Sequence, residues 1–252
     1  TKDFHTLIFQ TSFIDRNIEF LYNKIYKKNG KLFQSPDEAV DYLHGLETKD
    51  KGFIYNQLIK LTEEKIKLHL GCGHRYLPGF LHIDIDNSVP HLDYCSDIND
   101  LSMFDDASVD EIYTCGAIGY YDSDERTILF NEWNRVLKKG GKLRISVVDF
   151  EKQIEVYLKT NKNLRSPGVI GPMFGIWPFT DKQGIKRKAL KKTAYDYDTL
   201  KEVLLSFGFE DYKRYDWKEF NPPGYDDYSA AYVPHMDESG VHIMLNVECV
   251  KC

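Results

Sequence analysis

The amino-acid sequence predicts an α/β fold built on a doubly wound, mostly parallel sheet. Short apolar stretches typical of buried strands recur through the middle of the chain, and helical or crossover segments separate them. The first of these strands runs directly into a glycine-rich bend, a place where α/β proteins often bind a ligand. No internal repeat or low-complexity linker interrupts the pattern.

The first part of the chain predicts a helical N-terminal extension over residues 1–62. Apolar side chains recur at three- and four-residue steps between Phe13 and Ile25. Ser35 and Pro36 then supply an N-cap and a first-turn proline for a further helix. The second domain is predicted to span residues 63–252.

The middle of the chain supplies most of the predicted sheet. Strands are expected at residues 66–70, 80–85, 92–95, 109–114 and 142–148. A helix is expected over residues 123–137, with the lysine pair 138–139 in its last turn and the glycine pair 140–141 as its stop.

The last third predicts an irregular insertion, because proline and glycine recur through residues 160–190. The sheet is expected to close with a helix over 198–207 and an antiparallel pair of strands near 212–217 and 241–250. Residues 160–195 and the aromatic loop 218–240 are predicted to form the substrate side.

Composition narrows the class of protein. The chain is 42% hydrophobic and 29% charged, which is typical of a soluble globular protein. Its net charge of −6 argues against a general nucleic-acid binder. No apolar stretch approaches the roughly 18 residues of a membrane span, the start lacks a secretory signal pattern, and five scattered cysteines indicate reduced thiols. These features predict a cytoplasmic protein without a membrane span.

The glycine-rich bend consists of Gly71, Cys72 and Gly73, and it lets backbone N–H groups approach a ligand closely. A dinucleotide site would carry a third glycine where this chain has Tyr76. Asp84, which ends the second strand, follows Gly71 after thirteen residues, against roughly twenty in a nicotinamide site. A ligand with a ribose but no pyrophosphate therefore fits better.

The fragments LHLGCG, PGF, HIDID, SDI, SVDEIY and NEWNRVLKKGGKLRISVVDF resemble class I S-adenosylmethionine-dependent methyltransferases, of the small bacterial type linked with surface polysaccharide biosynthesis. The resemblance is strong over residues 64–150 and looser over 190–252. It implies a seven-stranded, Rossmann-like methyltransferase sheet. It also implies S-adenosyl-L-methionine as cofactor and S-adenosyl-L-homocysteine as product.

The resemblance further implies cofactor contacts. The bend would face the methionine part of the cofactor, and Asp84, next to Ile85, would bind both ribose hydroxyls. Asp84 could instead be a cap or turn residue, and Asp86 is a close competitor.

Beyond the second strand, Asp97 would accept from the adenine amino group with Ile98 stacking nearby, unless Asp97 only forms a turn. Cys115 and Gly116 would lie under the methionine chain.

Candidates for catalysis depart from the family pattern. Relatives follow the fourth strand with a His and then a Glu-His pair, where this chain has Gly116, Gly119 and Tyr120. The base must come from elsewhere, or the acceptor needs none. His235 is the candidate base, unless it only pins its loop. Asp149, after the fifth strand, is a candidate substrate contact or a helix N-cap.

Asp227, Tyr228 and Tyr232 in the aromatic loop are candidates for acceptor binding. Lys192 and Tyr195 are further candidates, because the resembling methyltransferases have residues that border the substrate at these places. Basic runs at residues 186–188 and 191–192 are either a solvated face or an anion-binding site. No metal site is predicted, because the pair Cys249 and Cys252 lacks the second pair that zinc requires.

We therefore predict a methyltransferase that O-methylates a small polar acceptor, such as a sugar, a nucleotide-sugar or a phosphorylated precursor of a cell-surface polysaccharide or capsule. Two alternatives stay open. One is a nicotinamide-dependent sugar-modifying oxidoreductase, and the other is a non-catalytic partner subunit that keeps the methyltransferase fold.

Overall fold

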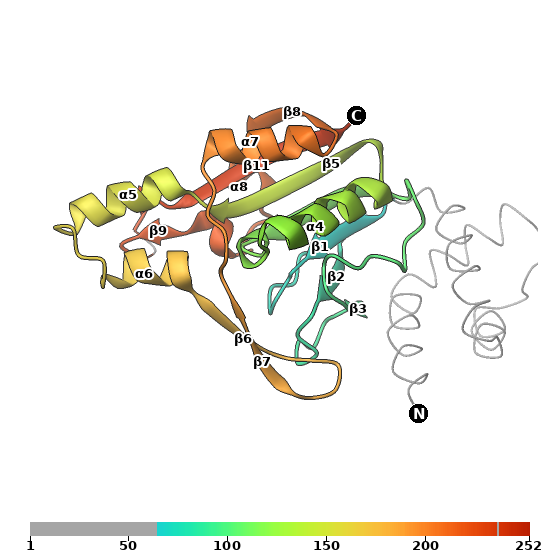
Figure 1. The fold of residues 1–252 in the computed structure, drawn as a ribbon, viewed down its shortest axis with the longest axis horizontal. Coiled ribbons are helices and arrows are strands. Elements are labelled where there is room, and N and C mark those ends of the chain that lie inside the picture. The colour runs from blue at the N-terminus through green and yellow to red at the C-terminus, as the bar shows by residue number, and fades with distance from the viewer. Residues whose placement is uncertain (1–64, 236) are drawn as a thin grey trace, which may run out of the picture. The chain divides into compact units, whose positions relative to one another are not determined.

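The computed structural model describes residues 65–235 and 237–252, so the predicted N-terminal extension lies outside the described residues. The described part forms one unit, Ile66–Cys252, built around a seven-stranded sheet in the order β3-β2-β1-β4-β5-β11-β8 (Figure 1). Its strands are β1 (Lys67–Leu70), β2 (Leu81–Asp84), β3 (Tyr94–Cys95), β4 (Val109–Cys115), β5 (Leu137–Val148), β8 (Phe209–Arg214) and β11 (Met244–Lys251).

The direction of the strands confirms the predicted fold class. The strands β1 to β5 are mutually parallel, and β11 runs antiparallel between β5 and β8. The carboxyl ends of β1, β2, β4 and β5 therefore meet at one edge of the sheet. That edge is where open α/β sheets bind their ligands.

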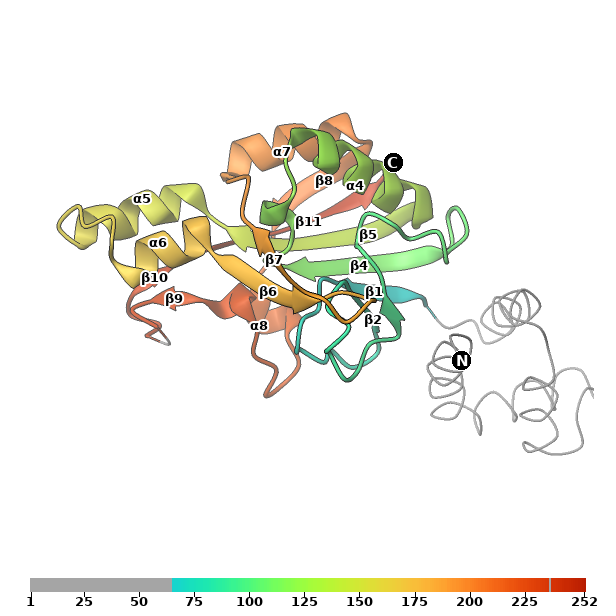
Figure 2. The same ribbon diagram turned by 60° about the horizontal axis from the view of Figure 1, so that its bottom comes forward.

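One face of the sheet is apolar and lies under two helices, α4 (Ser123–Val136) and α7 (Tyr197–Ser206), which occupy the same side of the sheet in both ribbon views (Figures 1 and 2). Both helices have acidic N-caps; Asp122 caps α4 in a reciprocal capping box with Glu125. The helices bury Leu129, Phe130, Trp133, Val136, Leu200 and Leu204. These side chains form an apolar core between the two helices and the sheet.

The predicted end of α4 is wrong. The helix ends at Val136, and residues 137–141 belong to β5. Gly140 has a φ of +73°, and the pairing between β4 and β5 shifts beside it, so the two glycines form a bulge rather than a helix stop. Lys251 caps the helix instead, because its Nζ donates to the carbonyl of Asn134 at 2.6 Å.

The opposite face of the sheet is polar. The connections 71–80 and 85–93 between parallel strands carry no helix, so C-terminal elements cover this face. They are α8 (Trp217–Phe220) and the short 3-10 helix η2 (Tyr228–Ala230). The ring of Phe220 lies 4.6 Å from that of Tyr113 and 4.7 Å from the Arg144 guanidinium. Arg144 is itself paired with Glu111 and Glu248 from neighbouring strands.

The remaining elements lie beyond the carboxyl edge. They are η1 (Ile118–Tyr120), α5 (Phe150–Lys159), α6 (Pro167–Phe174), β6 (Ile176–Thr180), β7 (Lys186–Leu190), β9 (Tyr232–Val233) and β10 (Val241–His242). No described helix is long and apolar enough to cross a bilayer.

The expectation of an irregular insertion over residues 160–190 is wrong. Pro167 begins α6 and Gly175 is its C-cap, while Pro172 lies inside the helix, and β6 pairs with β7 in an antiparallel hairpin. Asp181 closes the hairpin turn by accepting from the amides of Gln183 and Ile185 at 2.9 and 2.8 Å. The predicted strand 212–217 also ends early, at Arg214.

A buried histidine on the polar face makes stability depend on pH. His69 is 1% exposed, with its ring 5.6 Å from that of His82 and 5.2 Å from that of Tyr113. Burial, and then His82 and His91, hold its pKa well below the ordinary value of about 6.5. The unfolded chain therefore takes up this proton at higher pH, and stability is lost as the pH falls below about 6.5.

We expect the free energy of unfolding to drop by about 1 kcal/mol between roughly pH 7.5 and 5.5 through this group alone. Urea unfolding of the wild type and of His69→Gln at both pH values measures the difference. The variant, which keeps a polar but non-titrating side chain, is expected to show the weaker pH dependence. Equal pH dependence in the two proteins would contradict the assignment.

Candidate active site

The bend after β1 needs glycine for two physical reasons. Gly71 and Gly73 have φ values of +66° and +51°, a region that other residues rarely adopt. A Cβ on Gly71 would also lie only 2.7 Å from the Cβ of Ala117, after β4. The Gly71 amide donates to the carbonyl of Ile83 at 2.8 Å. The bend is therefore held closely between β2 and the segment that follows β4.

Asp84, at the end of β2, is 5% exposed and lies against the bend. One carboxylate oxygen accepts from the Gly73 amide at 2.8 Å, and the other accepts from the Asp86 amide at 2.8 Å. Burial raises the pKa of this carboxyl, although the two amides oppose the shift. Each oxygen keeps a lone pair beyond these bonds. The carboxylate can therefore accept two further donors, as a ribose diol would require.

Asp86 is engaged elsewhere. Its Oδ1 accepts from the Ser88 hydroxyl at 2.7 Å and from the Thr180 amide of β6 at 3.0 Å. Burial acts to raise its pKa, but hydrogen bonds from Thr180 and Ser88 outweigh burial and lower it. The Asn87 amide donates to the Thr180 carbonyl at 2.8 Å. Asp86 therefore joins the hairpin to the loop after β2.

The hairpin lies over the bend. A Cβ placed on Gly73 would be 3.5 Å from the Trp177 ring, so the indole covers the glycine backbone. Trp177 was not predicted as a site residue, because it lies in a segment expected to be irregular. Its amphipathic indole ring, typical of residues that line a binding site, is the signal that could have found it.

Asp97 and Ile98 follow β3. The Tyr121 hydroxyl donates to Asp97 Oδ1 at 2.7 Å, and the Asn99 amide donates to the same oxygen at 3.1 Å. The second bond confirms the turn interpretation of Asp97, and a contact with adenine stays a prediction. Ile98 is 3% exposed, and its carbonyl accepts from Trp133 Nε1 at 2.8 Å.

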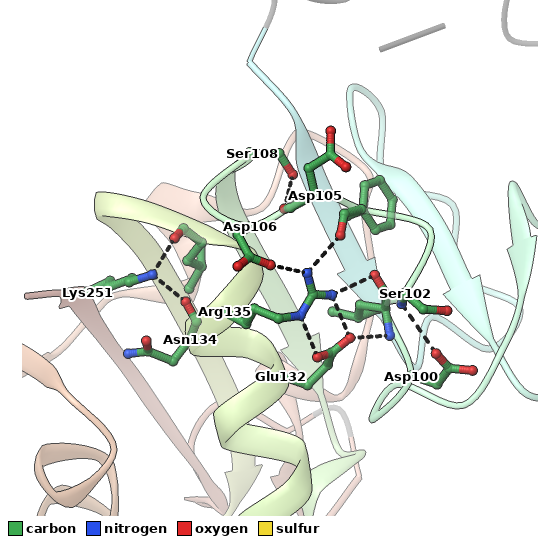
Figure 3. A network of polar contacts seen from close by, with 12 residues as sticks. Asp100, Ser102, Asp105, Asp106, Ser108, Glu132, Asn134, Arg135 and Lys251 are labelled. Atoms are coloured by element: carbon green, nitrogen blue, oxygen red, sulfur yellow. Dashed lines mark hydrogen bonds and ion pairs between the residues drawn. The ribbon is translucent and has the colours of Figure 1, made fainter. Parts of the chain in front are cut away.

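Arg135 fixes the segment between β3 and β4 to α4 (Figure 3). Its guanidinium pairs with Glu132 through Nε and Nη2, at 2.8 Å each. It also donates to the carbonyls of Phe104 and Leu101 at 2.9 and 3.1 Å, and to Asp106 at 2.7 Å. Glu132 accepts from the Leu101 amide at 2.9 Å. The Arg135 guanidinium, together with Glu132, therefore holds the backbone at Leu101 and Phe104, which follows Asp97 and Ile98 in the chain.

We expect Arg135→Ala to lower the free energy of unfolding by about 1–3 kcal/mol, because it removes the donor of the Phe104 carbonyl and the cation paired with the Glu132 carboxylate. Urea denaturation measures the loss. Arg135→Lys keeps the charge but not the planar fork, so an intermediate loss is expected. If Arg135→Ala had the same urea midpoint as the wild type, the network would contribute nothing to the free energy of unfolding.

A buried acidic group lies on the polar face near the end of β4. Asp227 is 5% exposed and accepts hydrogen bonds from the hydroxyls of Tyr113 and Ser229. The Ser229 amide donates to it at 2.9 Å, which caps η2. The Ser229 carbonyl in turn accepts from Asn246 of β11 at 3.0 Å. Asp227 is therefore fixed between β4 and the C-terminal loop.

Three polar atoms around Asp227 lack hydrogen-bond partners in the described part of the chain: Tyr215 Oη, Tyr225 Oη and Asn221 Oδ1. Burial raises the pKa of both phenols, and neighbouring Cys115 and Asp227 act in the same direction. Both hydroxyls are therefore protonated donors. We call Tyr113, Tyr215, Asn221, Tyr225 and Asp227 the Asp227 cluster.

The Asp227 cluster adjoins the bend. Arg75 Nη1, two residues after Gly73, lies 3.7 Å from an oxygen of Asp226. Cys72 contributes to the raised pKa of Tyr225. Cys115, at the end of β4, interacts with Asp227 and has its pKa raised, first by burial and then by that carboxylate. The loop that carries the cluster thus meets both the bend and the end of β4.

Other predicted cofactor residues lie at the same edge. Ile85 directly follows Asp84, and its carbonyl faces the thiol of Cys95 at 3.8 Å. Gly116 has a φ of +76°, and its amide donates to the Ser146 carbonyl at 2.8 Å. The end of β4 is therefore fixed to β5 directly below the predicted position of the methionine chain.

Asp149 caps α5, so the N-cap interpretation is confirmed. It is 1% exposed, accepts from the Glu151 amide at 3.1 Å and has Arg214 Nη1 at 3.7 Å. Tyr195 pairs with it and is also buried, with a hydroxyl that has no described partner. Lys192 lies 2.6 Å from Glu125 at the start of α4. Substrate roles for Asp149, Tyr195 and Lys192 stay predictions.

His235 and Tyr228 are exposed. His235 lies in the turn between β9 and β10. This hairpin packs beside α5 and α6 in both ribbon views (Figures 1 and 2), and the Tyr232 ring lies 4.9 Å from that of His242. Of the predicted acceptor-site residues, Asp227 is buried and contacts Tyr113 near the end of β4. The role of His235 stays a prediction.

Comparisons with known proteins agree with this geometry. A family profile described as a methyltransferase domain matches residues 68–145. No curated protein matches the chain.

Three similar solved structures are S-adenosylmethionine-dependent methyltransferases from Methanosarcina mazei, Archaeoglobus fulgidus and Mesorhizobium loti. The first is 16% identical, covers 75% of this chain and 93% of its own, and has a TM-score of 0.44. The second is 12% identical over 79% and 93%, with a TM-score of 0.44. The third is 15% identical over 83% and 100%, with a TM-score of 0.43.

The matched segment runs from β1 into β5 and contains the bend, Asp84 and Asp97. The predicted enzyme class and cofactor are therefore confirmed: the chain is an enzyme with a methyltransferase domain at residues 68–145, and its cofactor is S-adenosylmethionine.

Proposed function

We propose that this enzyme transfers a methyl group from S-adenosylmethionine to a hydroxyl of a small polar acceptor. The observation that carries the proposal is the buried Asp84 carboxylate, bonded to the Gly73 amide and able to accept two more donors. We assign to the cofactor the residues predicted from the sequence, namely Gly71, Cys72, Gly73, Asp84, Ile85, Asp97, Ile98, Cys115 and Gly116.

When bound, S-adenosylmethionine supplies a methyl group already activated on a positively charged sulfur. The chain must then hold the acceptor in line with that group and exclude water. A hydroxyl acceptor must also lose its proton, which requires a positioned base. We propose Asp227 as that base, because it is a buried carboxylate that accepts from Tyr113 near the end of β4, and its neighbour Asp226 lies 3.7 Å from Arg75, just after the bend.

The free hydrogen-bonding groups of the Asp227 cluster favour a hydroxyl as the acceptor. Tyr215 and Tyr225 offer O–H donors, and Asp227 offers an acceptor. An alcohol matches this set, since its hydrogen can face the carboxylate and one lone pair can accept from a phenol. The second lone pair then remains free for the methyl group. An amine must be neutral to react and has a single lone pair, which the methyl group takes, so the phenol donors would be left unpaired.

Charge in the cluster favours a neutral reacting end. The Arg144 guanidinium lies 5.9 Å from the Tyr215 ring and is already paired with Glu111 and Glu248, and Arg75 lies 3.7 Å from the carboxylate of Asp226. A phosphate placed beside Asp227 would therefore meet a negative charge without a free cation. A sugar or nucleotide-sugar, as in polysaccharide biosynthesis, would bind with a neutral hydroxyl inward and any phosphate elsewhere.

Calorimetry tests the cofactor part of the proposal. S-adenosylhomocysteine is expected to bind, and NAD and NADP are expected not to. Methyl transfer from labelled S-adenosylmethionine to neutral sugars, nucleotide-sugars and sugar phosphates then tests the acceptor. Binding of a nicotinamide cofactor alone would restore the oxidoreductase alternative. Cofactor binding without transfer to any of these acceptors would favour a non-catalytic partner subunit.

We expect Asp84→Ala to raise the Kd for S-adenosylhomocysteine roughly 5- to 150-fold, which corresponds to about 1–3 kcal/mol for a lost buried acceptor. Calorimetry measures the change. Asp86→Asn is the matched control, because it keeps an acceptor for Ser88 and Thr180, and less than a threefold change is expected. A larger loss in the control would move the ribose assignment to Asp86.

A further inference from the structure

The segment 161–192 is basic in an acidic protein. It carries eight lysine and arginine residues and one acidic residue, whereas the whole chain has a net charge of −6. Arg187 is paired with Asp181 at 2.5 Å, and Lys191 donates to the Pro172 carbonyl at 2.6 Å. Three exposed lysines near the hairpin tip form no ion pair with any described residue: Lys182, Lys186 and Lys188.

The same segment exposes large apolar side chains. Phe174, at the end of α6, is 61% exposed, and Leu190, at the end of β7, is 55% exposed. Other exposed apolar residues in the segment are Leu164, Ile170, Ile176 and Ile185. Together they are six of the thirteen large exposed apolar side chains in the described part of the chain. Such a concentration marks an interaction surface.

The strand pairing places the two kinds of side chain on one face. Directly opposed residues in an antiparallel pair point to the same side. Ile176 opposes Leu190, and Pro178 opposes Lys188. Lys186 opposes Thr180, two residues further toward the tip. This face therefore changes from apolar at its base to basic nearer its tip, with Ile185 and Lys182 in the turn.

The other face of the hairpin is turned toward the bend. Trp177 alternates with Ile176 and Pro178, and its ring covers Gly73. The free edge of β6 is joined to the loop after β2 through Thr180. The lysines at 186 and 188 therefore point away from the cofactor site. They are poorly placed to bind a phosphate of the acceptor there.

We propose that the outward face of the β6–β7 hairpin, with the end of α6, docks the enzyme on an anionic membrane surface. Apolar side chains would enter the headgroup boundary, and lysine ammonium groups would reach lipid phosphates on their long stems. A protein interface usually has an apolar centre with a polar rim. Apolar residues with basic residues beside them on one exposed face fit a lipid surface better.

The test is co-sedimentation of the full chain with vesicles of phosphatidylcholine, with and without about one third phosphatidylglycerol, at roughly 0.1 M salt. We expect binding to the anionic vesicles that weakens as salt is raised. The double variant Lys186→Gln/Lys188→Gln is expected to bind roughly thirtyfold more weakly, since each lysine contributes about 1 kcal/mol at such a surface. Lys139→Gln/Lys201→Gln, with the same change of charge at exposed sites elsewhere, is the control.

The double variant Ile176→Ser/Leu190→Ser separates insertion from simple charge attraction. It keeps every lysine, so weaker binding is expected only if apolar side chains enter the bilayer. Binding of S-adenosylhomocysteine by all three double variants, measured by calorimetry, shows that they fold. Wild-type protein that stays in the supernatant with anionic vesicles overturns the proposal. So does an equal loss in the control, or dimerisation through this face in sedimentation velocity without vesicle binding.

Discussion

Replacing Trp133 by alanine is expected to lower the free energy of unfolding by about 3–5 kcal/mol, the range for truncating a large buried aromatic side chain. Trp133 has no exposed surface and lies in the last turn of α4, with its ring 5.4 Å from that of Phe130. Its indole N–H donates to the Ile98 carbonyl at 2.8 Å. The substitution therefore opens a cavity and leaves a buried carbonyl unpaired. Urea or thermal unfolding measures the loss.

Trp133→Phe separates the two contributions. It keeps most of the ring volume but cannot donate to Ile98, so we expect it to lose roughly 1–3 kcal/mol. If Trp133→Phe lost as much free energy of unfolding as Trp133→Ala, the hydrogen bond to Ile98 would be the main stabilising contribution. A loss near zero in Trp133→Ala would mean that the core under α4 repacks without cost.

Strands and helices with a strong local pattern were predictable from the sequence. The bend after β1 follows from a strand that ends in Gly-x-Gly, and α4 follows from the apolar spacing of Leu129, Trp133 and Val136. These signals succeed because burial on one face of an element imposes a fixed period on the chain.

Elements that depend on distant contacts were not predictable in the same way. The β6–β7 hairpin lies in a segment rich in proline and glycine, and Trp177 is ordered by packing on Gly73. The predicted end of α4 was wrong because Gly140 forms part of a bulge in β5. Lys251, near the C-terminal end of the sequence, caps the helix instead. Local rules for helix stops cannot include a lysine 117 residues away from its acceptor, Asn134.

The residues of the candidate site also differ in how far the sequence predicts them. Asp84 is predictable because strand, bend and acid are close in sequence. Asp227 stood out only as part of a polar loop, and its neighbours Tyr113 and Tyr215 looked like ordinary strand residues. Their hydroxyls approach Asp227 because η2 and α8 fold onto the polar face of the sheet. That convergence is a property of the tertiary structure.

Replacing Asp227 by asparagine is expected to lower the rate of methyl transfer about 10²- to 10⁴-fold, the usual contribution of a positioned general base. The carboxamide has nearly the same shape and can still bond Tyr113 and Ser229, but it cannot take a proton. The Kd for S-adenosylhomocysteine is expected to stay the same. Single-turnover transfer of a labelled methyl group to whichever acceptor the wild type methylates measures the rate, and calorimetry measures the affinity.

Two matched variants decide between a base and a structural cap. Ser229→Ala removes a hydrogen bond to Asp227 but keeps the carboxylate, so it should lower the rate less than tenfold if proton transfer is what matters. Equal losses in both variants would mean that Asp227 serves to cap η2 and position the loop. His235→Ala completes the comparison. If that variant loses turnover while Asp227→Asn retains it, the proton leaves through the exposed histidine of the β9–β10 turn, and the loop must close over the bend during the reaction.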